Sequence, residues 1–200
     1  MNKNDSETRN EVVWQNAKIE KSERAKLKKQ TPTIIWLTGL PGSGKSTLAF
    51  ALDQYLTSQN YHTYVLDGDN IRHGLNKDLG FSSLDRTENV RRVGEVAKLF
   101  LDAGLIVIVA LISPFKTERD LVRKMVEDRE FTEVYVSTPL PVCESRDPKG
   151  LYKKARSGAL KNFTGIDSVY EPPDKPEVTI DTSNATIDAC VKMIFTKLDI

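Results

Sequence analysis

The sequence predicts an α/β fold in which a central parallel sheet carries helices on both faces. Short apolar runs alternate along the chain with longer segments of helical periodicity, which is typical of strands joined by crossover helices. The most apolar run, residues 105–111, contains no charged residue, as expected for a strand covered on both faces. A glycine-rich turn separates the first apolar run from the first helical segment.

The first strand is expected at residues 34–37, an apolar and β-rich run that stops before Gly39. The first helix is expected at residues 46–59, where large apolar side chains recur at helical spacing. A second strand follows at residues 64–66 and runs into the acidic turn Asp67-Gly68-Asp69.

The longest predicted helix covers residues 85–103, and its apolar side chains share one face. Gly104 marks its end, while Asp85 and Glu88 have the spacing of a capping box at its start. The following run, residues 105–111, is predicted to be the central strand of the sheet.

The last third of the chain is expected to begin with a helix at residues 117–128 and a strand at 134–136. A final strand at 178–180 precedes a helix at 187–198. Between them, residues 147–176 are rich in Lys, Gly, Pro and Asp and show little periodicity. In a compact domain such a stretch is typical of a functional lid.

Two hundred residues suffice for one well-buried α/β domain. We assign residues 31–200 to this domain and residues 1–30 to an N-terminal helical extension. The extension is rich in charges and helix formers. Its expected contacts with the domain are its few apolar side chains, Val12, Val13, Ile19 and Leu27.

Composition limits the possible partners and location. A net charge of +1 gives no basis for binding nucleic acid or a membrane surface, and no run approaches the length of a membrane span. Cys143 and Cys190 lie in apolar stretches without paired spacing, so we expect buried free thiols in a reducing cytoplasm. His62 and His73 have no metal-ligand spacing.

Residues 39–46 match the phosphate-binding pattern G-x-x-x-x-G-K-[ST] in full, between a predicted strand and a predicted helix. Lys45 is expected to reach the β- and γ-phosphates of ATP, and Ser46 to ligate Mg²⁺. A glycine turn without ligand is the alternative, which the full match disfavours. The motif predicts a three-layer P-loop NTPase-type fold that binds ATP through Gly39, Leu40, Pro41, Gly42, Ser43, Gly44, Lys45, Ser46 and Thr47.

Two carboxylates follow the second strand. Asp67 and Asp69 are one residue apart, and beside a P-loop they suit the ordering of Mg²⁺ waters and the acceptance of a proton from a hydroxyl. Asp-Gly-Asp is also common turn chemistry. We favour a catalytic role, with Asp69 as the candidate base and Asp67 as its support.

Arginines suited to a second anion site lie nearby. Arg72 and Arg86 stand next to a strand end and a helix start, where a planar fork can hold phosphate or sulfate. Arg91 and Arg92 equally fit a solvated helix face, and for these two we prefer that interpretation.

Six segments occur in the order typical of one enzyme family: WLTGLPGSGKST (36–47), LDGDNIR (66–72), LGFS (79–82), DRTENVRR (85–92), ISPF (112–115) and RDPKGLYKKAR (146–156). With these segments, and from about Trp14 to the C-terminus, the chain resembles the adenylylsulfate kinase family, which phosphorylates the 3′-hydroxyl of adenosine 5′-phosphosulfate (APS). One departure is Val169 in the predicted lid, where the family usually has proline.

The resemblance implies Mg²⁺-dependent transfer of the ATP γ-phosphoryl group to APS, and a homodimer. It further implies that Lys161 and Phe163 lie in a mobile segment closing over both nucleotides. Because a planar adenine favours aromatic faces, we expect Phe81 and Phe163 to hold it between them. Phe81 alone is also compatible with the core. The implied acceptor contacts are Arg72, Phe81, Arg86, Asn89, Ile112 and Ser113. Lys153, Lys154 and Arg156 are expected to neutralise phosphates as the lid closes.

Ser113 has two interpretations. Family members are often described with a phosphoserine at this position, whereas direct in-line transfer needs mainly positioning and charge stabilisation. No candidate base is adjacent to Ser113 in the sequence, so we expect it first to contact the acceptor.

Two rival functions remain open. One is a small-molecule kinase for a sugar acid or a nucleoside monophosphate on the same fold. The other is a regulatory switch that binds and slowly hydrolyses ATP or GTP, against which the sequence lacks an Asn-Lys-x-Asp guanine motif.

Overall fold

The computed structural model describes residues 12–200 and contains one sheet of parallel strands. Its order is β2-β3-β1-β4-β5. The strands are β1 (Thr33–Thr38), β2 (Thr63–Asp67), β3 (Ile106–Ala110), β4 (Phe131–Val136) and β5 (Val178–Ile180). The prediction that residues 105–111 form the central strand is wrong, because β1 occupies the centre and β3 lies between β1 and β2. Both strands are fully buried, so hydrophobicity alone does not reveal their order.

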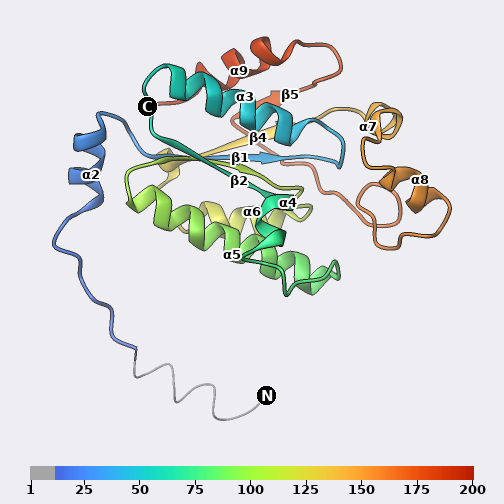
Figure 1. Cartoon of the computed structure of the whole chain (residues 1–200), viewed down its shortest axis with the longest axis horizontal. Helices are drawn as coiled ribbons and strands as arrows, with labels where there is room; N and C mark the ends of the chain where they lie inside the picture. The colour runs from blue at the N-terminus through green and yellow to red at the C-terminus, as the bar shows by residue number, and fades with distance from the viewer. Residues whose placement is uncertain (1–11) are drawn as a thin grey trace.

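Helices cover both faces of the sheet, as predicted (Figure 1). On one face lie α3 (Lys45–Ser58) and α9 (Ile187–Phe195), and on the other α5 (Ser83–Asp102) and α6 (Lys116–Arg123). Alternate residues of β3 supply the two cores: Ile106 and Ile108 point to the α3 side, and Val107 and Val109 to the α5 side. Period-two alternation thus divides one apolar run between two layers.

Some helix limits differ from the sequence prediction. Helix α5 begins at Ser83 because the Ser82 hydroxyl caps it, accepting a hydrogen bond from the Asp85 backbone N at 3.2 Å. The predicted Asp85–Glu88 capping box is therefore wrong. Helix α6 ends at Arg123, and the short 3₁₀ helix η2 (Asp128–Glu130) follows separately.

Three short helices escaped the sequence analysis: α4 (Gly68–His73), α7 (Leu140–Arg146) and α8 (Leu151–Arg156). One or two turns are too short to display a 3.6-residue period. In Figure 1, α7 and α8 lie beyond the carboxyl ends of the strands; α7 directly precedes the predicted lid, and α8 lies near the start of it. A small core of Cys143, Tyr152, Ala155 and Phe163 holds this region together.

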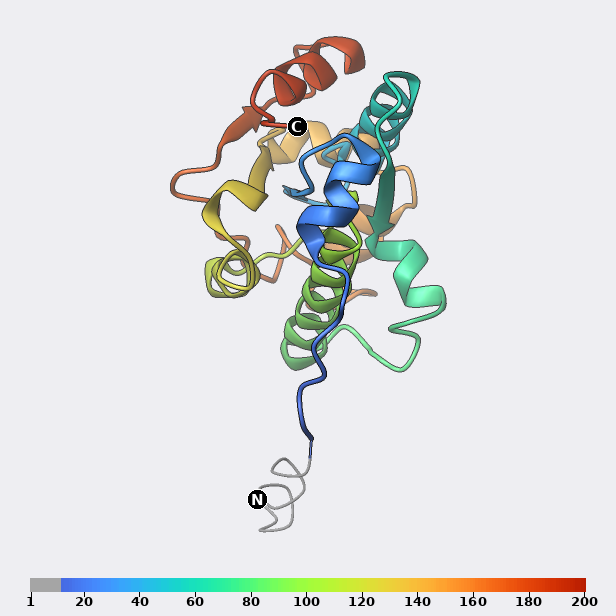
Figure 2. The ribbon, with the colours of Figure 1, turned by 90° about the vertical axis from the view of Figure 1, so that its left-hand side faces the viewer.

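The N-terminal extension contains one helix within the described residues, α2 (Lys21–Lys28), seen in the foreground of Figure 2. Polar contacts attach it: Arg24 donates to Asp102 at 2.6 Å, and Lys21 forms an ion pair with Glu130. The predicted apolar attachment is wrong, because Val12, Val13, Ile19 and Leu27 are all exposed. Residues 1–11 of the predicted extension lie outside the described part.

From residue 12 onward, the helices are either too short or too polar to cross a membrane.

Candidate active site

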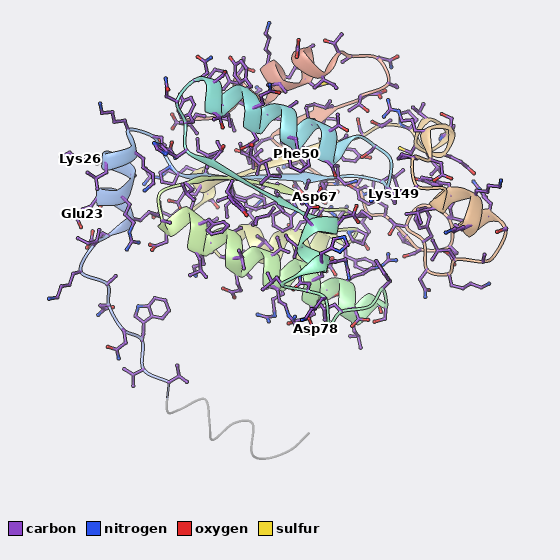
Figure 3. The ribbon with its side chains drawn as sticks, in the orientation of Figure 1. Glu23, Lys26, Phe50, Asp67, Asp78 and Lys149 are labelled. Carbon is purple, nitrogen blue, oxygen red and sulfur yellow. The ribbon has the colours of Figure 1, made fainter. Side chains whose placement is uncertain are left out.

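A cleft of about 880 Å³ opens at the carboxyl ends of the strands, where parallel α/β sheets bind ligands. The P-loop lines one side of it, and residues from α4, α5 and the loop after β3 line the other. The lid adds a third wall. Figure 3 labels two of the side chains involved, Asp67 at the end of β2 and Lys149 in the lid.

The P-loop takes the turn that its glycines allow. Gly39 has φ +153°, and a Cβ there would lie 2.4 Å from the carbonyl oxygen of Val136. Gly44 has φ +99° and directly precedes α3, so the loop ends at a helix N-terminus with its partial positive charge. Pro41, Gly42, Gly44, Lys45, Ser46 and Thr47 line the cleft, whereas Gly39, Leu40 and Ser43 do not.

Lys45 is folded back onto its own loop. Its Nζ donates to the carbonyl oxygens of Gly39 at 2.9 Å and Leu40 at 2.7 Å. Burial lowers the pKa of Lys45 to about 8, although Cys143, Asp67 and Asp69 oppose this shift. The ammonium group is therefore poorly compensated until an anion enters the loop.

Ser46 and Asp67 bring hard oxygen atoms together at the mouth of the P-loop. The Ser46 hydroxyl donates to Asp67 Oδ2 at 2.7 Å. Across residues 12–200 no three His, Cys, Asp or Glu side chains gather as a metal cage. Mg²⁺ beside a nucleotide commonly uses only one or two carboxylates together with phosphates and waters, so this pair fits it.

The Asp67-Gly68-Asp69 segment has the turn chemistry that was one interpretation of its sequence, and the catalytic role stays a prediction. Asp67 is buried and caps α4, because its Oδ1 accepts from the backbone N of Asp69 at 3.0 Å and of Asn70 at 3.3 Å. Asp69 is instead exposed and forms an ion pair with Lys149 from the lid. Turn chemistry thus fixes Asp67 beside Ser46, whereas the Asp69 carboxylate lines the cleft together with its partner Lys149.

On the acceptor side, two arginines line the cleft. Arg72 donates to the Gly80 carbonyl at 2.8 Å, and its guanidinium lies 4.6 Å from the centroid of the Phe81 ring. Arg86 spans from α5 to the lid, donating to Thr164 Oγ1 at 2.7 Å and also to the Asn162 carbonyl. Burial lowers the pKa of both arginines.

Ser113 is buried and has φ +38°, a left-handed conformation that is uncommon for serine. Its hydroxyl accepts a hydrogen bond from Trp36 Nε1 at 3.0 Å. Ile112 and Asn89 also line the cleft, and the amide oxygen of Asn89 accepts from Asn76 at 3.0 Å. No base contacts the Ser113 hydroxyl among the described residues, and its role as an acceptor contact stays a prediction.

The two predicted adenine-binding rings differ in environment. Phe81 is 65% exposed, so its interpretation as a core residue is wrong. Phe163 is 7% exposed and packs edge-on against Tyr152 at 4.9 Å between centroids, so it is part of the lid core. Both rings line the cleft, together with the exposed Lys161. The polar sequence around Phe163 concealed its burial because its apolar partners come from α7 and α8.

Several charged residues lie apart from the cleft. The expected phosphate contacts Lys153, Lys154 and Arg156 are absent from its lining, and Arg156 instead pairs with Glu144 at 2.8 Å. Arg91 and Arg92 pair with Glu88, which confirms their preferred interpretation as a solvated helix face.

The predicted free, buried state of Cys143 and Cys190 is also confirmed.

The sequence analysis missed four cleft residues that now stand out: Lys149, Arg146, Tyr152 and Thr182. Arg146 donates to Thr182 Oγ1 at 2.8 Å, and Tyr152 Oη donates to the Pro41 carbonyl at 2.8 Å. Thr182 lies two residues after the end of β5, so its place at a strand carboxyl end was a usable signal. Lys149, Arg146 and Tyr152 belong to a quoted family segment but were assigned no such role.

The family model for adenylylsulphate kinase matches residues 31–181. The chain belongs to the adenylylsulfate kinase family. It is 58% identical over 187 residues to an adenylyl-sulfate kinase of Marinobacter nauticus, covering 94% of each chain, and 58% identical over 183 residues to that of Clostridium acetobutylicum, covering 92% of this chain and 91% of the relative.

Solved structures agree with this assignment. An adenylylsulfate kinase of Mycobacterium tuberculosis in complex with AMPPNP and APS has a TM-score of 0.81 and 46% identity, with 85% of this chain and 99% of that chain covered. A sugar kinase of Janibacter at 18% identity and TM-score 0.60 shares the fold alone. The predicted P-loop kinase fold and the predicted family are thus confirmed, and the chain is a phosphotransferase with an alcohol acceptor.

Proposed function

We propose that this chain transfers the γ-phosphoryl group of ATP to the 3′-hydroxyl of APS, giving 3′-phosphoadenosine 5′-phosphosulfate and ADP. The observation that carries the proposal is the cleft of about 880 Å³, in which the P-loop lies on one side and Arg72, Arg86 and Phe81 lie on the other. The family assignment supports the same acceptor.

The P-loop residues hold ATP. In the proposed complex, Lys45 leaves the carbonyls of its own loop for the β- and γ-phosphates, which compensate its buried charge. Ser46 and Asp67 would hold Mg²⁺, which supplies charge neutralisation between the phosphates when it is bound.

The acceptor lies on the opposite side. Arg72 and Arg86 hold its phosphosulfate, and the exposed ring of Phe81 stacks on its adenine. Asp69 orients the 3′-hydroxyl and accepts its proton. Ser113 and Ile112 contact the acceptor, and Lys161 and Phe163 approach it from the lid.

Mass spectrometry of the products after incubation with ATP, Mg²⁺ and a panel of acceptors tests this function. APS is expected to gain one phosphoryl group while a sugar acid and a nucleoside monophosphate do not. Preferred phosphorylation of either of those, or release of free phosphate alone, contradicts the proposal. The proposal also includes that the enzyme forms a homodimer and works in the cytoplasm.

A further inference from the structure

The loop that follows β3 is held through three successive carbonyl oxygens. Thr38 Oγ1 donates to Ile112 O at 2.7 Å, Arg119 Nη1 donates to Ser113 O at 2.6 Å, and the Glu171 backbone N donates to Pro114 O at 2.8 Å. This loop carries the left-handed Ser113, so its conformation depends on these donors.

Arg119 provides the central donor from α6, outside the cleft. It is 2% exposed, and each of its three guanidinium nitrogens donates one hydrogen bond. Nε donates to Glu133 Oε1 on β4 at 2.8 Å, and Nη2 donates to the Glu171 carbonyl at 2.7 Å. One planar fork therefore joins the acceptor loop, the sheet and the C-terminal part of the lid segment.

The lid segment is tied to the same point from its own side. The Glu171 carboxylate accepts from the backbone N of Lys116 at the start of α6, at 2.8 Å. The Tyr170 hydroxyl lies 3.0 Å from Thr38 Oγ1, and its ring lies 5.9 Å from the Arg119 guanidinium. Movement of residues 170–171 would thus alter the donors that hold the acceptor loop.

We propose that Arg119, fixed by Glu133, is a positioning residue that sets the acceptor loop at Ser113 and links it to the lid segment at Glu171. It contacts no substrate, and its effect reaches the acceptor through the backbone of residues 112–114. The inference rests on the proposed function, because the ligand of this loop is taken to be APS.

Two variants test the proposal. Arg119→Lys keeps a positive charge opposite Glu133 but loses the planar fork. The double variant Arg119→Met, Glu133→Leu replaces the ion pair by apolar side chains, a change that often preserves stability. Both are expected to raise KM for APS roughly 10- to 100-fold, the scale of losing a hydrogen bond from a charged donor, while the calorimetric Kd for ATP alone stays within about twofold.

Arg123→Met is the matched control. Arg123 is one turn further along α6 and reaches Glu133 at 3.5 Å and Glu177 at 2.8 Å, but it has no hydrogen bond to the acceptor loop or the lid. Its loss should leave KM for APS unchanged.

An unchanged KM for APS in Arg119→Lys overturns the positioning role, as does an equal loss of ATP and APS binding. Wild-type protein that does not phosphorylate APS at all refutes the proposed function instead, so the two failures are distinguishable.

Discussion

At the scale of single residues, Lys45 shows how the P-loop prepares for an anion. The side chain is buried among backbone carbonyls, and its pKa of about 8 lies below the ordinary value of 10.5. Carbonyl dipoles compensate the ammonium group less well than phosphate charges do. The free site thus holds an incompletely neutralised cation, which favours binding of a polyanion.

We expect ATP binding by this lysine to take up a proton above pH 8. Free Lys45 loses its proton as the pH rises through about 8, and bound phosphates restore the charged form by raising its pKa. ATP affinity should consequently fall above pH 8, by up to about tenfold per pH unit. Calorimetry in two buffers of different ionisation enthalpy measures the uptake, which should increase between pH 7 and pH 9.

Lys45→Arg is the control, because arginine stays protonated throughout this range. The same rise in proton uptake in both proteins would assign it to another group.

Asp69→Asn should lower turnover by roughly 10²- to 10⁴-fold, the usual contribution of general acid–base catalysis, with a much smaller effect on binding. The exposed Asp69 carboxylate pairs only with Lys149 among the described residues, so its loss should cost little stability. Steady-state kinetics with APS measure the effect. Asp78→Asn removes another exposed, ion-paired carboxylate, labelled in Figure 3, and serves as control. An unchanged turnover with a raised KM would make Asp69 a binding residue.

Ser113→Ala should retain measurable kinase activity with weaker APS binding. The hydroxyl accepts a hydrogen bond from Trp36, and no base within residues 12–200 contacts it, which favours direct transfer over a phosphoserine route. Kinetics of the variant, together with intact-mass analysis of wild-type protein after incubation with ATP, test this. Complete loss of activity alongside a chemically competent phosphoserine would establish the covalent route.

At the scale of elements, the long helices and the strands were predictable because their apolar periodicity extends over several turns or a whole buried run. The lid was recognised only by its composition. Helix α7, just before the lid, has seven residues, and α8, within it, has six. The small core beside them depends on contacts between Cys143, Tyr152 and Phe163, which no local sequence pattern displays. The sequence motifs were sufficient to locate the cleft. The burial of Phe163 could be seen only in the structure, because its apolar partners are distant in the sequence.

The two aromatic rings near the acceptor should therefore respond differently to truncation. Phe81→Ala should weaken APS binding by roughly 5- to 150-fold, the scale of one base–aromatic stack, and should barely change the melting temperature because the ring is exposed. Phe163→Ala should lower the stability of the lid, with a cost of up to about 3–5 kcal/mol for a buried phenylalanine. Calorimetric titration and thermal unfolding separate the effects.

ATP binding supplies the internal control for this pair, since Phe81→Ala should leave it unchanged. A loss of APS affinity in Phe163→Ala but not in Phe81→Ala would show that Phe163 of the lid, and not Phe81, stacks on the adenine.

At the scale of the whole molecule, the parallel sheet separates stability from chemistry. All its strands run in one direction, so their carboxyl ends border the cleft and their amino ends lie on the opposite side of the molecule. Gln30 lies on that opposite side, beside the amino ends of the strands. Its side chain donates to the carbonyls of His62 at 3.0 Å and Gly104 at 2.9 Å, and accepts from the His62 backbone N at 2.8 Å. Gln30 thus links the segments that lead into β1, β2 and β3, although the sequence analysis assigned it to the N-terminal extension.

We expect Gln30→Ala to lower the free energy of unfolding by roughly 2–4 kcal/mol, because three hydrogen bonds are lost and partly buried backbone groups remain unpaired. Kinetic constants at a temperature where the variant is folded should be unchanged, since the cleft is at the other edge of the sheet. Denaturant unfolding measures the stability. Gln59→Ala is the matched control, because the Gln59 side chain is exposed and its amide donates only to Ser58 among the described residues. Equal stability of the two variants would show that the Gln30 hydrogen bonds do not stabilise the sheet. A selective loss of APS turnover in Gln30→Ala would show that the amino ends of the strands are coupled to the cleft.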